Sequence, residues 1–570
     1  MTEQKNNDIP ASKPLKSSGL RQLAKETAIY GMSSILGRVL NWLLVPIYTR
    51  VLINTGEYGI VTNIYAWTAL LLILLTYGME TGFFRFVNAD KALSTKANKK
   101  GFNLPESQNV IYSTTLYSIA STSLIFIVLA ITFLSPISSA LGYAENKEYI
   151  AMMACIVAVD AFCCIPFAWL RYKNRPVRFA FIKLANIFLN IFLNIFFLIV
   201  CPWINARNPQ LISWFYSPDY GVGYIFVANV FTTAMTLLML VPDMMPGLKT
   251  RPNRLKLKEM LKYSYPLLIL GIAGIFNQTA DKILYPFIIE DKTVADAQLG
   301  IYGACFKIAV IMVMFIQAFR YAYEPFIFSR NRTNVNANVG ANANTTAANA
   351  NAVTNAVTNA TTTTAVAAVG KQYSEAMKYF IIFALVIFLG VMFYLDIIKY
   401  FVGEQYYSGL SVVPLVMLGE LFFGIYFNLS VWYKLTDQTR WGAYFSIIGC
   451  IATVLIIILF VPTFGFIACA WASVASNLLM MLLSYFIGRK RYPIKYDLRS
   501  ALIYSLLAAV CYCTAMLPTF ENDTVKMAYK TVILSVFLAF IYCDFKFGNL
   551  QKLIFSRFPF HKRKPKCPSF

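Results

Sequence analysis

Residues 442–462 read GAYFSIIGCIATVLIIILFVP and contain no charged side chain. At about 1.5 Å per residue, a helix of this length crosses the roughly 30 Å hydrocarbon core of a bilayer. Apolar runs of similar length recur along the whole chain, so this stretch is one of a series. The sequence therefore predicts an all-α, polytopic membrane protein.

The series predicts about 14 transmembrane helices, because each apolar run is long enough to span the bilayer once. We expect them at residues 27–47, 60–79, 110–134, 149–170, 179–200, 222–242, 263–287, 300–322, 379–398, 409–432, 442–462, 465–487, 501–517 and 528–545.

The composition agrees with a chain that lies mostly in lipid. Of the 570 residues, 58% are apolar and 14% are charged, whereas soluble proteins carry roughly 25% charged residues. The net charge of +23 does not indicate a nucleic-acid partner, because the Lys and Arg residues lie between the apolar runs and not on one soluble face. We therefore expect no nucleic acid to bind.

The positive charges predict the orientation in the membrane. Of the 50 Lys and Arg residues, 38 fall in the N-terminal segment, in alternate loops and in the C-terminal tail, and six fall in the other loops. Cytoplasmic loops retain positive charge. Both termini are therefore predicted to be cytoplasmic, with tails at 1–26 and, strongly basic, at 546–570.

An internal repeat is suggested by ungapped comparison of the two halves. At an offset of 240, Gly31 falls on Gly271, and at an offset of 241, Gly59 falls on Gly300. An even number of helices in each half gives both halves the same orientation, and transporters built in this way bind substrate between the halves. We predict a six-helix lobe at 27–245, a second at 263–487, and two extra helices at 501–545.

The segment 331–370 departs from this plan. It consists almost wholly of Asn, Ala, Thr and Val and has no charge after Arg332. This composition lacks a sustained apolar face and predicts a disordered cytoplasmic insert in the second lobe. We interpret it as an expanded linker without a function of its own.

Ionisable residues inside the predicted spans mark candidate sites, since each costs about 2.5–3.5 kcal/mol on insertion. Arg38 lies near mid-depth in the first span, either as an anion ligand facing a cavity or as the partner of a carboxylate on another helix. The further candidates for substrate binding are Arg85, Lys282, Lys307 and Arg320. The candidates for ion coupling are Asp160, Asp281 and Glu420.

The carboxylates leave two interpretations open. Asp160 and Glu420 occupy equivalent places in the middle of the fourth and tenth spans. Each could take up a coupling proton or could bind a neighbouring hydroxyl. Asp281 and Lys282 are adjacent, so a helix directs them about 100° apart, and Lys307 could pair with Asp281.

No cofactor or metal is expected. The only histidine is His561, the 11 cysteines form no CxxC pair, and most of them lie inside apolar segments. The sequence contains no GxxxxGK[ST] phosphate-binding loop. The interpretation is a transporter and not an enzyme, driven by an ion gradient, the membrane potential or the substrate gradient.

Several short motifs resemble a known family. They are KETAIYG at 25–31, GR at 37–38, PIYTRVL at 46–52, EYG at 57–59, QTADKIL at 278–284, GIY at 300–302 and AYEP at 322–325. They resemble the Wzx-type oligosaccharide flippases, the polysaccharide biosynthesis proteins of the multidrug/oligosaccharidyl-lipid/polysaccharide (MOP) exporter superfamily. The resemblance covers the first twelve spans.

The resemblance implies two six-helix lobes around a central cavity and alternating access. Its members move undecaprenyl-pyrophosphate-linked oligosaccharides, such as units of lipopolysaccharide O-antigen, capsule or exopolysaccharide, across the bacterial inner membrane. Arg38 matches the basic residue of the first helix that attracts the anionic lipid-linked sugar. The implied partners are this substrate, membrane lipids and other polysaccharide-assembly proteins.

Three other functions stay open. A multidrug antiporter of the sister family (MATE-like) is the nearest, and a flippase of lipid-linked peptidoglycan precursor comes next. A membrane polymerase or ligase would need a sizeable outward-facing surface. The longest outward loop, about 201–221, has a length more usual for a connection, so transport is preferred.

Overall fold

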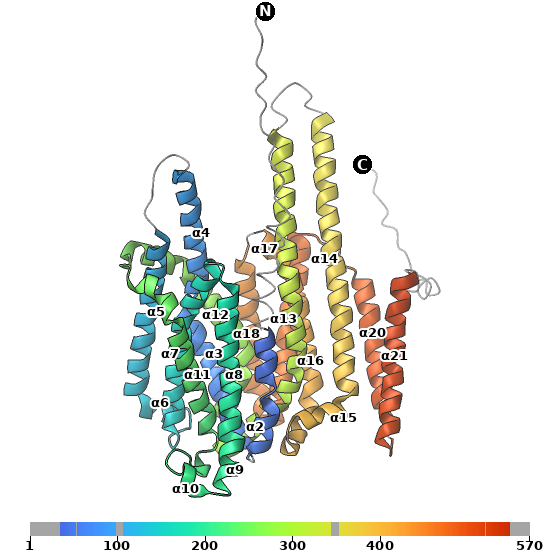
Figure 1. The fold of residues 1–570 in the computed structure, drawn as a ribbon. Coiled ribbons are helices and arrows are strands. Elements are labelled where there is room, and N and C mark those ends of the chain that lie inside the picture. The colour runs from blue at the N-terminus through green and yellow to red at the C-terminus, as the bar shows by residue number, and fades with distance from the viewer. Residues whose placement is uncertain are drawn as a thin grey trace, which may run out of the picture. The chain divides into compact units, whose positions relative to one another are not determined.

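The computed structural model describes residues 35–547 except 53, 99–106, 344–352, 437 and 519. This part of the chain is built of helices and contains no strand (Figure 1). Thirteen of its helices are long and apolar enough to cross a membrane. They correspond to the second to fourteenth predicted spans, so the all-α polytopic fold is confirmed. Most of the predicted span 27–47 lies outside the described residues.

The helices form two compact units. The first unit comprises residues 1–44 and 68–268, and the second comprises 45–67 and 269–570. Helix α3 (Thr55–Thr76) and helix α12 (Arg254–Ile288) each contribute to both units. The two predicted six-helix lobes stay a prediction.

The first unit is centred on α7 (Lys147–Tyr172), which packs against five further helices. These are α4 (Met79–Asn98), α5 (Ser107–Thr132), α6 (Leu134–Ala140), α8 (Pro176–Ile195) and α11 (Gly223–Leu248). The short helices α9 (Cys201–Asn205) and α10 (Pro209–Ile212) lie between α8 and α11 in the chain. The rings of Tyr112 and Trp169 stack with centroids 4.3 Å apart in its core. Such aromatic pairs hold helices together in a medium that supplies no hydrophobic drive between them.

A sharp break separates α3 from α4. Tyr77 and Gly78 have positive φ angles of 32° and 71°, which glycine adopts readily and tyrosine rarely. The Tyr77 hydroxyl lies 2.7 Å from the Ser118 hydroxyl of α5 and fixes the break. The more polar helix α4 (Met79–Asn98), which carries Arg85, begins directly after this break.

The second unit is built around α16 (Val413–Leu429), which packs closely on α19 (Phe466–Arg491). Its other helices are α2 (Val45–Val51), α13 (Lys292–Ala343), α14 (Val353–Phe393), α15 (Leu395–Ile398), η3 (Lys399–Phe401), η4 (Glu404–Val412), α17 (Val431–Leu435), α18 (Arg440–Phe464), α20 (Leu498–Met516) and α21 (Asp523–Phe547). The C-terminal hairpin of α20 and α21 packs on α14 (Figure 1).

Glycines allow α3 and α13 to touch backbone to backbone. A Cβ atom on Gly59 would collide with the carbonyl oxygen of Asp296, and one on Gly300 would collide with that of Thr55. The repeat offset of 241 carries Thr55 onto Asp296 and Gly59 onto Gly300. The two contacts are therefore reciprocal, as in the interface of a symmetric pair.

The described helices reach into the segment 331–370 from both sides, and its residues 344–352 lie outside the described part of the chain, so its disorder stays a prediction. Helix α13 continues to Ala343, and α14 begins at Val353. Alanine, which is frequent here, is the best helix former, so it lets each flanking helix extend. That the segment lacks a function stays a prediction.

Candidate functional site

Asp160 and Lys183 form a charged pair in the first unit. Asp160 lies at the middle of α7, and Lys183 lies on the neighbouring α8, where their charges attract each other. Both side chains are exposed, and among the described residues neither forms an ion pair. A charge facing hydrocarbon is too costly, so we infer that these groups face a water-filled space. We call them the open pair.

Few direct contacts hold the open pair. The Thr233 hydroxyl of α11 donates a long hydrogen bond of 3.5 Å to Asp160, and the Lys183 ammonium lies 4.0 Å from the centre of the Phe167 ring. The ring provides a cation–π contact without neutralising the lysine. Both charges therefore stay available to a ligand or an ion.

A row of asparagines continues from Lys183 along α8. The amide of Asn186 donates to the Thr236 hydroxyl at 2.8 Å, and that of Asn190 donates to Asn229 at 2.8 Å, both on α11. Asn194 donates to the Asn190 carbonyl at 2.8 Å. These bonds satisfy the amide donors within the protein and fix α8 against α11, so the row is a polar support beneath the open pair.

Ion pairs connect the helices of the first unit near Arg171, Arg175 and Arg178. The carboxylate of Asp243, which is 5% exposed, accepts from Arg178 at 2.7 Å and lies 3.6 Å from Arg175. Glu80 pairs with Arg171. These pairs are satisfied within the protein, and we assign them to structure.

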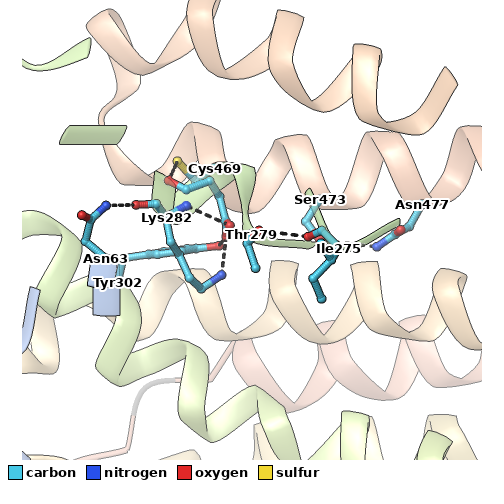
Figure 2. Close-up of polar contacts among 9 residues, drawn as sticks. Asn63, Ile275, Thr279, Lys282, Tyr302, Cys469, Ser473 and Asn477 are labelled. Carbon is cyan, nitrogen blue, oxygen red and sulfur yellow. Dashed lines mark hydrogen bonds and ion pairs between the residues drawn. The ribbon is translucent and has the colours of Figure 1, made fainter. Parts of the chain in front are cut away.

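Asp281 and Lys282 form a different arrangement in the second unit (Figure 2). The Lys282 ammonium lies 2.7 Å from the Asp281 carboxylate, and the Tyr302 hydroxyl donates to the same oxygen at 2.6 Å. Asn63 donates to the Lys282 carbonyl at 2.7 Å. We call these four residues the closed cluster. Its two charged side chains are only 10% and 13% exposed.

Asp281 and Lys282 pair although they are adjacent in the helix. Adjacent helical residues point about 100° apart, but the flexible stem of Lys282 brings its ammonium back to Asp281. The same ammonium lies 4.0 Å from the centre of the Phe306 ring. Lys307 and Glu420, both half-buried, interact electrostatically with Lys282, so three helices contribute charges here.

The other basic candidates are dispersed. Arg85 is exposed, and its guanidinium lies 4.0 Å from the centre of the Tyr263 ring. The guanidinium of Arg320, in the second unit, lies 4.3 Å from the centre of the Phe427 ring. Arg38 is exposed in the helical stretch 35–42 and forms no ion pair with any described residue.

The sequence candidates thus divide between the units. Asp281, Lys282, Lys307 and Glu420 come together in the second unit, whereas Asp160 lies near Lys183, which was not among the candidates for its site. The asparagine row was also missed, although NIFLNIFLN at 186–194 repeats at the four-residue spacing of one helix face. Within the described residues, no three His, Cys, Asp or Glu side chains gather as a metal site.

Comparison with known families gives one match. Residues 23–329, more than half of the chain, match the family described as polysaccharide biosynthesis protein. No curated protein matches the chain in sequence.

Solved structures share the fold over nearly their whole length. The lipid II flippase MurJ, in an inward closed conformation, has a TM-score of 0.62 and 13% identity, covering 90% of this chain and 99% of its own. An inward-facing multidrug resistance MATE family transporter of the MOP superfamily has a TM-score of 0.59 and 13% identity, covering 83% and 97%. The MATE multidrug transporter DinF-BH has a TM-score of 0.53 and 15% identity, covering 85% and 99%. At these identities the likeness establishes a shared fold.

Proposed function

Because the chain belongs to the polysaccharide biosynthesis protein family, we propose that it is a flippase for undecaprenyl-pyrophosphate-linked oligosaccharide. The substrate would be a repeat unit of O-antigen, capsule or exopolysaccharide, carried across the bacterial inner membrane by alternating access. The family match carries this proposal, since it spans the whole first unit from residue 68 onward together with the N-terminal part of the second.

The exposed cations support an anionic substrate. Arg38 and Lys183 both lie within helices of the first unit, and no described carboxylate pairs with either. A pyrophosphate needs cationic donors along its route, and a guanidinium offers it a bidentate fork. In the second unit, Lys282 is neutralised by Asp281 and is a weaker candidate ligand.

Asp160 is the best-placed candidate for ion coupling. Its side chain is exposed, accepts one long hydrogen bond from Thr233, and interacts electrostatically with the nearby Lys183. Asp281 is engaged by Lys282 and Tyr302 and has less freedom to exchange a proton. Glu420 lies beside the closed cluster and is the second candidate.

A multidrug antiporter is the second function to test, because the exposed carboxylate of Asp160 could bind a cationic drug. A flippase of lipid-linked peptidoglycan precursor shares the lipid pyrophosphate chemistry and differs only in the saccharide. Polymerase or ligase activity has the least support. Membrane lipids and other polysaccharide-assembly proteins are the proposed partners, and both termini would be cytoplasmic.

The test is flipping in proteoliposomes that contain defined lipid-linked saccharides. We expect Arg38→Ala to lower the flipping rate at least about tenfold, since hydrogen bonds to a charged group contribute about 1.5–3 kcal/mol. Arg38→Lys should be intermediate, because it keeps the charge and loses the fork. Arg207→Ala serves as the matched control, since Arg207 stacks on Trp203 outside the helical core.

Two outcomes would contradict the proposal. Wild-type protein that exports a cationic dye but flips no lipid-linked saccharide would establish the antiporter instead. Full flipping by a well-folded Arg38→Ala variant would remove Arg38 from the substrate route and leave Lys183 as the cation to test.

A further inference from the structure

A groove in the first unit is separate from the charged sites. It has a volume of about 470 Å³ and lies between the end of α3, the middle of α5 and the first half of α12. Its lining residues are Leu74, Tyr77, Ser118, Thr122, Leu261, Ser264, Tyr265 and Leu268. We call it the α5–α12 groove. Its volume is within the roughly 300–1,000 Å³ of ligand pockets.

The wall of the groove suits an apolar chain. The Tyr77 and Ser118 hydroxyls bond to each other, and Thr122 bonds to the Ser118 carbonyl of its own helix. Ser264 donates to the Gly78 carbonyl. The hydroxyls of Tyr77, Ser118, Thr122 and Ser264 are thus bonded within the protein, so an apolar occupant would not leave these four groups unpaired. Leu74 and Tyr265 are 47% and 65% exposed and offer apolar contact surface to an occupant of the groove.

The same face of α12 becomes basic toward its N-terminus. Lys258 and Arg254 precede Leu261 by three and seven residues, which places all three on one helix face. Both side chains are exposed. At 1.5 Å per residue they lie about 4.5 Å and about 10 Å along the axis from Leu261. The nearest acidic residue of α12, Glu259, faces away and pairs with Lys256.

We propose that the α5–α12 groove binds the isoprenoid chain of a polyprenyl phosphate or pyrophosphate lipid, with its phosphate at Lys258 and Arg254. The inference rests on the proposed function and adds the place where the lipid part of the substrate docks. Branched leucines and tyrosine rings match the branched, unsaturated isoprene units. The predicted orientation places α12 with its N-terminus at the cytoplasmic surface, so the groove receives substrate in the leaflet where the substrate is made.

Photolabelling of the full-length protein in nanodiscs tests the site. The probe is a polyprenyl phosphate with a diazirine on its chain, and the comparison probes are the matching polyprenol and a diacyl phosphatidylglycerol with the same diazirine. We expect labels at 118–122 and 261–268, and about tenfold stronger labelling by the phosphate than by the polyprenol, equal to about 1.4 kcal/mol.

Two sets of variants separate the chain from the phosphate. Thr122→Phe places a ring in the groove and should lower labelling by the polyprenyl phosphate about tenfold. Thr514→Phe is its control, because Thr514 is an exposed helical threonine with the same bond to its own helix. Lys258→Gln with Arg254→Gln should reduce labelling by the phosphate to that by the polyprenol. Monodisperse elution and an unchanged melting temperature must accompany each variant.

Three results would overturn the inference. Equal labelling by phosphatidylglycerol, equally blocked by Thr122→Phe, would mean ordinary bilayer lipid. No groove label from any probe would mean that a segment of the chain, such as residues 1–34, fills the groove. Labels elsewhere would mean another site. If the wild-type protein flips lipid-linked saccharides and any of these three results is found, only the groove assignment fails. If the groove is labelled but the protein flips no lipid-linked saccharide, the proposed function fails instead.

Discussion

The open pair and the closed cluster each contain one aspartate and one lysine, but the two sites differ in exposure and in ion pairing. Asp160 and Lys183 stand on two helices, are exposed, and form no direct ion pair. Asp281 and Lys282 are adjacent in sequence, lie 2.7 Å apart and are almost fully buried. A charge that must meet a substrate cannot also be neutralised by its neighbour. We therefore propose that the open pair serves transport and that the closed cluster serves structure.

The surroundings of the two sites strengthen this assignment. Asn63 of α3 and Tyr302 of α13 hold the closed cluster, and both lie close to the glycines at which these helices touch. The open pair has only a long hydrogen bond and one ring beside it. A site that binds and releases a ligand needs charged groups with few fixed contacts. A site where two helices cross needs charged groups that are fully bonded within the protein.

The largest expected effect comes from separating the helices that carry the closed cluster. Gly300→Ala adds a Cβ that collides with the Thr55 carbonyl oxygen, so α3 and α13 must move apart. We expect a loss of at least about 3 kcal/mol, at the upper end for overpacking, and little folded protein in detergent. Gly390→Ala is the control, since its Cβ would meet nothing within 4 Å. A Gly300→Ala protein as stable as this control would show that the crossing is not fixed.

Next in size is the loss of one partner from the closed cluster. Lys282→Met leaves the Asp281 carboxylate buried with only the Tyr302 hydroxyl and the backbone N–H of residue 282 as partners, which should destabilise the protein by about 3 kcal/mol, the lower end of the range for a broken buried pair. The double variant Asp281→Leu with Lys282→Met should recover much of that loss, because no charge stays buried. Thermal unfolding in detergent measures both. Additive losses in the double variant would argue against a structural ion pair.

The open pair should behave in the reverse way. Asp160→Asn and Lys183→Met should each lower transport about tenfold or more while changing stability by less than about 1 kcal/mol, the range of exposed charge pairs. Flipping rates and melting temperatures of the same preparations give both quantities. Asn186→Leu is the matched control, since it removes a structural amide from the same face of α8. A melting temperature lowered as far as in Lys282→Met would make the open pair structural as well.

The sequence predicts the helices well and the sites less well, for physical reasons. Apolar length alone locates the spans, because the bilayer thickness fixes it. Loop-charge counting and span position single out Asp160 and Asp281, but they do not show that Asp160 stays open while Asp281 is closed. That difference depends on which helices become neighbours and on the reach of the Lys282 stem. The asparagine row was readable from its spacing, whereas the Tyr77–Gly78 break arises from tertiary contacts with α5 and α12.

The smallest expected effect concerns a third ion cluster, at the edge of the second unit, which sharpens the comparison because pH can titrate it. Asp396 accepts from Lys530 at 2.8 Å and from Lys526 at 2.9 Å, and so ties the α21 end of the C-terminal hairpin to α15. Burial alone would raise the pKa of Asp396, but the hydrogen bonds and charges of Lys530 and Lys526 outweigh it, and its pKa falls below the ordinary value of 3.8.

A carboxylate with a lowered pKa in the folded state stabilises the protein above its unfolded pKa, and this contribution is lost as the pH falls through the folded pKa. We therefore expect wild type to melt slightly above Asp396→Asn at pH 7, and the two melting temperatures to converge as the pH falls below about 4. Because the carboxylate is 36% exposed, added salt should shrink the difference. Asp291→Asn is the control, since hydrogen bonds within its own turn, led by that from Thr293, lower the pKa of Asp291 without tying two elements together. Melting curves that differ equally at pH 7 and pH 3 would show that Asp396 acts by its shape and not by its charge, and the hairpin would then be held by its packing on α14 and by the ion pair between Lys378 and Asp544.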